Sequence, residues 1–228
     1  MEDYLTEEEF VWLQDHKGSI VVAPEKNFPP FAYIDNKGFF KGISADYLEA
    51  IEKKFGINFL IAPSFHLSKS LRLLKDGEID LMTSLSKTDE RSSYLQFSDP
   101  YIKVPAVIIT RDTSLNNLSV EDLAGWTIGV GKDYAIHEYL KKNYPNLNLK
   151  PDKDDLICLE KLAIGNIDAV ITDIASASWF IKENSLFNLV LAGQTDFIYE
   201  LCMAVPKENA MLLKIVNKTL QNLSKSEI

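Results

Sequence analysis

The sequence is poor in the residues that build cross-linked, fibrous or disordered chains. Its 228 residues include 2 cysteines, 10 glycines and 9 prolines, too few for a disulfide scaffold, a collagen-like repeat or a disordered chain rich in Gly and Pro. The remainder is ordinary, with 46% hydrophobic and 25% charged residues. A chain of this length and composition is expected to fold as one large domain or two modest ones.

Long apolar runs and an excess of positive charge are also missing. Stretches such as Val104–Ile109 are far shorter than the roughly 20 apolar residues of a membrane-spanning helix. The 33 acidic and 24 basic residues give a net charge of −9, which argues against nucleic acid or anionic lipid as the main partner. Met1–Tyr4 lack the features of a secretory signal, which by itself favours a cytoplasmic location.

The residues that usually mark metal or catalytic sites are few and scattered. The 3 histidines show no metal-ligand spacing, and neither a G-x-S-x-G elbow nor a P-loop occurs. We therefore predict no metal, no cofactor and no catalytic residue. Cys158 and Cys202 fall in different lobes of the layout predicted below, so we expect two separate thiols rather than a disulfide.

One short pattern occurs twice, about 88 positions apart. Gly77–Thr83 (GEIDLMT) matches Gly165–Thr172 (GNIDAVIT), and each copy follows an amphipathic segment and precedes a new helix start. Two earlier apolar segments, Ile20–Ala23 and Thr127–Val130, correspond as well. Short strands that alternate with helices indicate parallel α/β sheets. The duplication therefore predicts two similar α/β lobes.

Local signals predict several element boundaries. Thr6 and Glu9 form a capping box, which predicts a helix that ends near Gly18. A second helical pattern is expected to end at Gly56. The adjacent prolines of the Phe28–Phe31 segment exclude a helix interior or a central strand there.

Polar residues follow the strand of the first repeat. Thr83, Ser84 and Ser86 leave its end, and Thr88 is a plausible cap for a helix that carries Arg91. A helix N-terminus and a guanidinium together favour a bound carboxylate. The alternative is that Arg91 pairs with a nearby aspartate on a solvated face.

Asp173 stands at the matching place after the second strand. Ligands of open α/β sheets bind beyond the carboxyl ends of the strands, so a zwitterion that bridges Arg91 and Asp173 is one interpretation. The alternative role for Asp173 is a helix N-cap. Two further candidates are Phe28, which can form an apolar wall, and Tyr134, which opens a helix whose amides suit an anion.

Several motifs occur in an order typical of a known family. They are Phe28–Tyr33 (FPPFAY), Gly42–Asp46 (GISAD), Thr88–Arg91 (TDER), Phe97–Tyr101 (FSDPY), Leu123–Val130 (LAGWTIGV) and Gly165–Asp173 (GNIDAVITD). In this order the sequence resembles the bacterial amino-acid-type solute-binding protein family. The resemblance covers nearly the whole chain.

The resemblance implies a two-lobed α/β architecture, the type II periplasmic-binding-protein fold. Each lobe would be a mainly parallel sheet flanked by helices, and two crossovers would hinge the lobes. Lobe 1 would comprise residues 1–110 and 197–228, and lobe 2 residues 111–196. The hinge would lie near Thr110–Thr113 and Gly193–Phe197.

The resemblance also implies roles for the candidate residues. Arg91 would grip the α-carboxylate of a small amino-acid-like ligand, and Asp173 would take its α-amino group. Hydroxyl and amide contacts would come from Thr83, Ser84 and Ser86, and an aromatic cover from Phe28. The chain departs from the family pattern at Asp133-Tyr134. The extra carboxylate of Asp133 would repel a bound carboxylate. Because of this departure, a small carboxylate other than an amino acid, or no ligand at all, stays an alternative.

A narrower resemblance points to a sensor. Leu5–Glu9 and Tyr134–Ile136 resemble the Venus-flytrap sensor domains of virulence-sensor-type histidine kinases. It implies a non-enzymatic, periplasmic part of an inner-membrane receptor, with a membrane helix beyond residue 228, and leaves open a homodimer of the full receptor. The alternatives are a free amino-acid-binding protein of an ABC transporter, a cyclohexadienyl dehydratase-like enzyme on the same fold, and a sensor that works with an empty or closed cleft.

Overall fold

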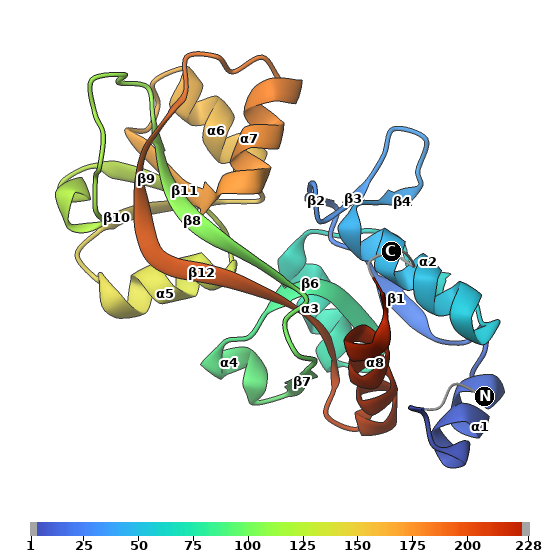
Figure 1. The fold of residues 1–228 in the computed structure, drawn as a ribbon. Coiled ribbons are helices and arrows are strands. Elements are labelled where there is room, and N and C mark those ends of the chain that lie inside the picture. Colours follow the sequence, from blue (N-terminus) through green and yellow to red (C-terminus); the bar gives the residue numbers. More distant parts are fainter. Residues whose placement is uncertain (1–3, 225–228) are drawn as a thin grey trace. The chain divides into compact units, whose positions relative to one another are not determined.

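The computed structural model describes residues 4–224, which form two compact units (Figure 1). Unit 1 contains the chain up to residue 27, residues 31–102 and the chain from residue 200 onward. Unit 2 contains residues 28–30 and 103–199. The lobe and hinge boundaries expected from the sequence stay a prediction.

Unit 1 is built on parallel strands that helices flank. Strand β1 pairs in parallel with β5 and β6, while the final part of β12 runs antiparallel to β6 and β7. A small sheet, β2-β3-β4, precedes helix α2. The elements are α1 (Glu7–Asp15), β1 (Val21–Ala23), β2 (Asn27–Phe28), β3 (Ala32–Ile34), β4 (Phe40–Lys41), α2 (Ile43–Phe55), β5 (Leu60–Ile61), α3 (Leu67–Lys75), β6 (Leu81–Ser86), α4 (Asp89–Ser92), β7 (Leu95–Phe97) and α8 (Ala210–Asn222).

Unit 2 repeats this plan. Strand β9 pairs in parallel with β10 and β11, and β11 pairs antiparallel with β8. Helices α6 and α7 pack against each other beside this sheet (Figure 1). The elements are β8 (Ile102–Thr110), a short 3-10 turn (Glu121–Leu123), β9 (Thr127–Gly131), α5 (Ala135–Asn143), β10 (Asn148–Asp152), α6 (Asp155–Ala163), β11 (Ala169–Asp173), α7 (Ile174–Glu183) and β12 (Val190–Pro206).

The sequence repeat is a structural repeat. Asp80 Oδ2 accepts a hydrogen bond from the Val21 amide at 2.8 Å, and Asp168 Oδ2 accepts one from the Thr127 amide at 2.7 Å. The Asp80 and Asp168 amides each donate back to the carbonyl of the same partner, at 2.9 Å. In both units the repeated aspartate therefore ties the start of one parallel strand to the start of its neighbour.

Of the two predicted helix ends, that of α2 agrees with the structure and that of α1 does not. The Thr6 capping box is present, but α1 ends at Asp15, before the expected Gly18. Helix α2 ends at Phe55 and is capped by Gly56 as predicted, in the left-handed conformation that glycine adopts readily. Because polar residues from Asp15 to Lys17 give α1 no further apolar face to bury, the helix stops a few residues early.

Each unit has its own apolar core. That of unit 1 gathers residues of β1, α2 and α8, and that of unit 2 gathers residues of β8, α6 and α7. Cys158 and Cys202 are buried free thiols, as predicted. The mixed α/β class with parallel sheets and flanking helices is confirmed.

Candidate functional site

The predicted site residues fall into two groups, one in each unit. We call Thr83, Ser84, Ser86 and Arg91 the unit 1 half-site, and Phe28, Tyr134 and Asp173 the unit 2 half-site. Both lie at the carboxyl ends of parallel strands, β6 in unit 1 and β9 and β11 in unit 2. This is the edge at which open α/β sheets bind ligands.

Arg91 is held from both sides by its own loop. Its side chain is 2% exposed, and Nη1 donates a hydrogen bond to the Ser86 carbonyl at 2.7 Å. Its amide donates to Thr88 Oγ1 at 3.2 Å, which confirms Thr88 as the cap. A solvated position for Arg91 is therefore wrong. The argument from a helix N-terminus fails too, since α4 is a single turn of four residues with little dipole to offer.

Two hydroxyls of the unit 1 half-site are buried without a partner. Thr83 Oγ1 and Ser86 Oγ have no hydrogen-bond partner among the residues that the structure describes. A buried polar group in that state costs about 1–3 kcal/mol. Both therefore gain from any ligand that brings a polar atom to the end of β6.

Ser84 is fixed by a network that sequence reasoning missed. It has a φ of 55°, which is rare for a residue with a side chain. Its amide donates to the Tyr101 hydroxyl at 2.9 Å, and its Oγ lies 2.5 Å from Ser44 Oγ. Ser44 Oγ lies 2.7 Å from the Tyr101 hydroxyl. Burial raises the pKa of Tyr101, so the phenol stays protonated. The network holds an uncommon backbone conformation inside the half-site.

The two carboxylate oxygens of Asp173 have different environments, one of which confirms the helix cap. Oδ1 accepts a hydrogen bond from the Ser176 amide at 2.8 Å and so caps α7. Oδ2 is buried and has no hydrogen-bond partner in the described part of the chain. Burial raises the pKa of Asp173 to about 6, against the opposing effect of the hydrogen bonds from Ser176. A ligand ammonium would supply the missing donor and the missing charge.

Aromatic side chains accompany Asp173 in unit 2. The rings of Phe28 and Tyr134 meet edge to face, with centroids 6.0 Å apart. The Tyr134 ring lies over Gly131, where an added Cβ would stand 2.5 Å from a ring carbon. Ser176 Oγ donates to the Pro29 carbonyl at 2.7 Å, which fastens the proline loop beside the start of α7. Phe28 and Tyr134 therefore form an aromatic pair in unit 2, and the role of Phe28 as a wall of a ligand site stays a prediction.

Asp133, which departs from the family pattern, has a backbone conformation that a hydrogen bond to His137 fixes. Asp133 has a φ of 62°, and its amide donates to His137 Nδ1 at 3.2 Å. Burial, followed by the charge of Lys141, lowers the pKa of His137, so the ring is neutral and can accept. The turn at Asp133-Tyr134 before α5 is therefore held by a specific hydrogen bond to α5.

Of the missed residues, Ser44 and Tyr101 belong to motifs already noted, GISAD and FSDPY. Their pairing with Ser84 spans 40 and 17 positions, which no local pattern reveals. Chemically, a guanidinium with hydroxyls suits a carboxylate, and a carboxylate with aromatic rings suits an ammonium beside an apolar group. Within residues 4–224, no group of three or more His, Cys, Asp or Glu is placed to hold a metal ion.

Comparison with known proteins identifies the family. Residues 20–228 match the model for bacterial extracellular solute-binding proteins, family 3. The chain is 28% identical to the virulence sensor protein BvgS of Bordetella pertussis over 218 residues, and 26% identical to the L-cystine-binding protein TcyJ of Escherichia coli over 211. These matches cover 95% and 92% of the chain.

Solved structures agree with the sequence relatives. A histidine kinase sensor domain with similarity to periplasmic binding proteins superposes with a TM-score of 0.87 at 26% identity, over 93% of this chain and 92% of that one. The match spans 18% of the length of BvgS but 79% of TcyJ. The matched proteins are binding or sensor proteins, so the expectation of a non-enzymatic binding domain is confirmed and the dehydratase alternative is not supported.

The family description also bears on location. Its members are extracellular solute-binding proteins, which supports a position outside the cytoplasm and corrects the expectation from Met1–Tyr4. Among the described residues, no helix combines the length and the apolar character needed to cross a membrane.

Proposed function

Because the chain belongs to the bacterial extracellular solute-binding proteins of family 3, we propose that it is the periplasmic ligand-sensing domain of a membrane-bound sensor histidine kinase. The ligand is a small amino-acid-like molecule or a small carboxylate. It binds through both half-sites and favours a closed arrangement of the two lobes, which is the signal.

The unpartnered Oδ2 of Asp173 carries this proposal. A buried carboxylate oxygen without a donor is costly, and its place at the carboxyl end of β11 is a ligand position. Arg91, at the corresponding end in unit 1, provides the complementary charge for a ligand carboxylate. One zwitterion satisfies both charges.

The remaining half-site residues fit the same ligand. Thr83 Oγ1 and Ser86 Oγ are buried acceptors and donors beside Arg91 on β6. The buried aromatic pair of Phe28 and Tyr134 would suit an apolar or cationic ligand side chain. An amino acid therefore matches the groups in hand better than a dicarboxylate, because Asp173 would repel a second anion.

Closure requires that the ligand bind the closed arrangement more tightly than the open one. A shift from 1:99 to 99:1 needs about 5.5 kcal/mol of differential binding. Two charge-assisted contacts that form together, at Arg91 and at Asp173, supply a free energy of that order. The hinge is expected near Thr110–Thr113 and Gly193–Phe197.

The sensor assignment is supported by the similarity to BvgS and to the histidine kinase sensor domain. The second candidate, a free binding protein of an ABC transporter, is favoured by the match to 79% of TcyJ. The sequence of the intact gene beyond residue 228 separates the two. A membrane helix followed by a kinase domain supports the sensor, and a stop codon supports the transporter protein.

A thermal-shift screen against the twenty amino acids and small carboxylates tests the ligand class, because selective binding raises the melting temperature. Arg91→Ala should abolish the response, whereas Arg72→Ala, a matched control outside the half-sites, should keep it. Asp173→Asn should weaken an amino acid more than its deaminated analogue. Equal losses for the two ligands, or an unchanged response in Arg91→Ala, would refute the assigned contacts.

A further inference from the structure

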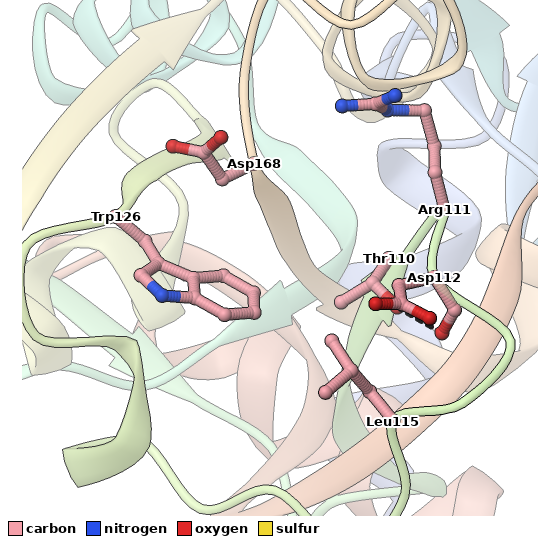
Figure 2. A pocket seen from close by; sticks show the side chains of 6 residues that line it. All are labelled: Thr110, Arg111, Asp112, Leu115, Trp126 and Asp168. Atoms are coloured by element: carbon pink, nitrogen blue, oxygen red, sulfur yellow. Dashed lines mark hydrogen bonds between the residues drawn. The ribbon is translucent and has the colours of Figure 1, made fainter.

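A pocket of about 410 Å³ lies in unit 2, away from its half-site. Figure 2 shows the six side chains that line it: Thr110, Arg111, Asp112, Leu115, Trp126 and Asp168. We call it the base pocket. Its volume falls in the range of small-molecule sites.

The base pocket lies at the opposite end of the sheet from Asp173. Asp168 precedes β11, whereas Asp173 ends it, so the two carboxylates are about 16 Å apart along the strand. Trp126 precedes the parallel strand β9, and Arg111 follows β8, which runs antiparallel to β11. The topology thus brings three sequence-distant residues to the amino ends of the strands.

The charged side chains that line the base pocket are those of Arg111, Asp112 and Asp168. Each has hydrogen-bonding atoms that no described residue uses. Arg111 makes no ion pair with any described residue, and its guanidinium lies 3.5 Å from where a Cβ on Gly165 would stand, at the C-terminus of α6. The partial negative charge of the helix end favours a cation there. Gly165 has a φ of 83° and no side chain to displace it.

Each carboxylate uses one oxygen locally. Asp168 Oδ2 accepts from the Thr127 amide at 2.7 Å, and Asp112 Oδ1 accepts from the Ser114 amide at 2.9 Å and from Ser114 Oγ at 2.6 Å. The hydrogen bonds from Ser114 lower the pKa of Asp112, so it is ionised at neutral pH. Asp168 Oδ1 and Asp112 Oδ2 have no hydrogen-bond partner in residues 4–224.

The remaining walls are apolar. The indole of Trp126 projects into the hollow between Asp168 and Leu115 in Figure 2. Trp126 and Leu115 are half-buried, so each keeps surface for a ligand. A planar or alkylated cation that stacks on an indole beside a carboxylate gains both cation–π and ionic attraction.

We propose that the base pocket is a second ligand site, which takes a small zwitterion with its carboxylate on Arg111 and a planar or alkylated cation against Trp126 and Asp168. This site does not depend on the two half-sites. It gives the domain a second place at which a small molecule can act.

Titration with guanidinobutyrate tests the proposal. This probe has a carboxylate and a planar cation but lacks the α-ammonium that Asp173 would need. The readout is the indole N–H resonance of Trp126 in ¹⁵N-labelled protein, identified by its loss in Trp126→Phe. We expect a saturable shift with a roughly millimolar dissociation constant, and a response at least about tenfold weaker to butyrate, which has no cation, and to agmatine, which has no carboxylate.

Matched variants separate a site from a chance contact. Arg111→Gln and Asp168→Asn should each weaken binding by about tenfold or more. Arg72→Gln and Asp80→Asn should leave it unchanged, and Asp80 makes the same strand contact as Asp168 without lining the pocket. Arg91→Ala should also leave it unchanged, whether or not the half-sites bind a ligand.

Three results would overturn the proposal. They are a shift of Trp126 that does not saturate, an equal response to butyrate, and a loss of the shift in Arg91→Ala. If Asp168→Asn fails to fold, Arg111→Gln still decides, because the exposed Arg111 side chain makes no hydrogen bond to the described residues.

Discussion

Asp173 caps helix α7 through the amide of Ser176, 2.8 Å from Oδ1, while its other carboxylate oxygen is buried with no hydrogen-bond partner among the described residues. The same side chain therefore stabilises a helix and carries a desolvated charge. In the unbound protein the second effect opposes folding at neutral pH.

Asp173→Asn should stabilise the unbound protein above pH 6. The folded-state pKa of Asp173 is raised from 3.8 to about 6, so its ionisation penalises folding above that pH. The penalty disappears as the pH falls from about 6 to about 4. Asparagine keeps the cap and removes the charge, so we expect about 1–2 kcal/mol more stability at pH 8 and little change at pH 4.

Urea unfolding at both pH values measures this effect. Asp154→Asn is the matched control, because Asp154 caps α6 in the same way through the Ile157 amide. A gain at pH 8 that is equal at both caps, or absent at Asp173, would contradict the account.

Tyr101→Phe should weaken the unit 1 half-site. Loss of the hydroxyl removes the bonds to the Ser84 amide and Ser44 Oγ and leaves buried polar groups unpaired. We expect the free energy of unfolding to fall by about 1–3 kcal/mol, measured by urea unfolding, and ligand binding to weaken with it. The control is Tyr47→Phe, because the Tyr47 ring packs on Tyr101 at 4.9 Å but its hydroxyl bonds to no described residue. Equal effects of the two changes would count against the network.

Glu9→Gln should remove a step in acid stability. Burial favours the neutral acid, but hydrogen bonds from Lys218, from the Thr6 amide and from Lys214 outweigh it and lower the pKa of Glu9 to about 2. Its contribution is full above pH 4.5 and is lost as the pH falls towards 2. We expect wild type to lose about 1–3 kcal/mol over that range.

The measurement is the unfolding free energy of wild type and Glu9→Gln at several pH values between 5 and 2. The variant should have a lower free energy of unfolding than wild type at pH 5, and this free energy should change less as the pH falls below 5. Glu8→Gln, at an exposed position in the same helix turn, should retain the wild-type profile, and a profile as flat as that of Glu9→Gln would disprove the assignment.

Gly131→Ala should displace the Tyr134 ring, because the new Cβ would lie 2.5–2.7 Å from three ring carbons. We expect a loss of about 1–3 kcal/mol from overpacking, measured by urea unfolding. In a Tyr134→Ala background the same change should cost little, since the ring is gone. A double-mutant cycle with no coupling between the two positions would show that the ring is not the obstacle.

Much of the fold could be predicted because local sequence patterns determine it. The repeat that contains Asp80 and Asp168 predicted two equivalent α/β units, and both aspartates make equivalent strand contacts. Burial of Arg91 could not be predicted in this way. Its environment depends on the path of the loop from β6 to α4 and on the short length of that helix, neither of which the cap at Thr88 specifies.

The contacts that sequence reasoning missed join residues that lie far apart in the chain. Phe28 and Tyr134 lie 106 positions apart, and nothing local links them. Arg111 and Asp168 line one pocket because β8 runs antiparallel to β11, an orientation that strand propensity does not specify. Residue type and position suggested the half-site residues, while the topology of the sheet sets which residues meet.

The long strand β12 fixes the order in which the chain can fold as it is synthesised. Its last residues, Leu201–Pro206, pair with β6 and β7, so the sheet of unit 1 stays incomplete until these residues have left the ribosome. Helix α8, which closes the core of unit 1, emerges later still. All of unit 2 precedes residue 200. The later-encoded unit is therefore the first able to finish folding, while the amino-terminal hundred residues wait for the last thirty.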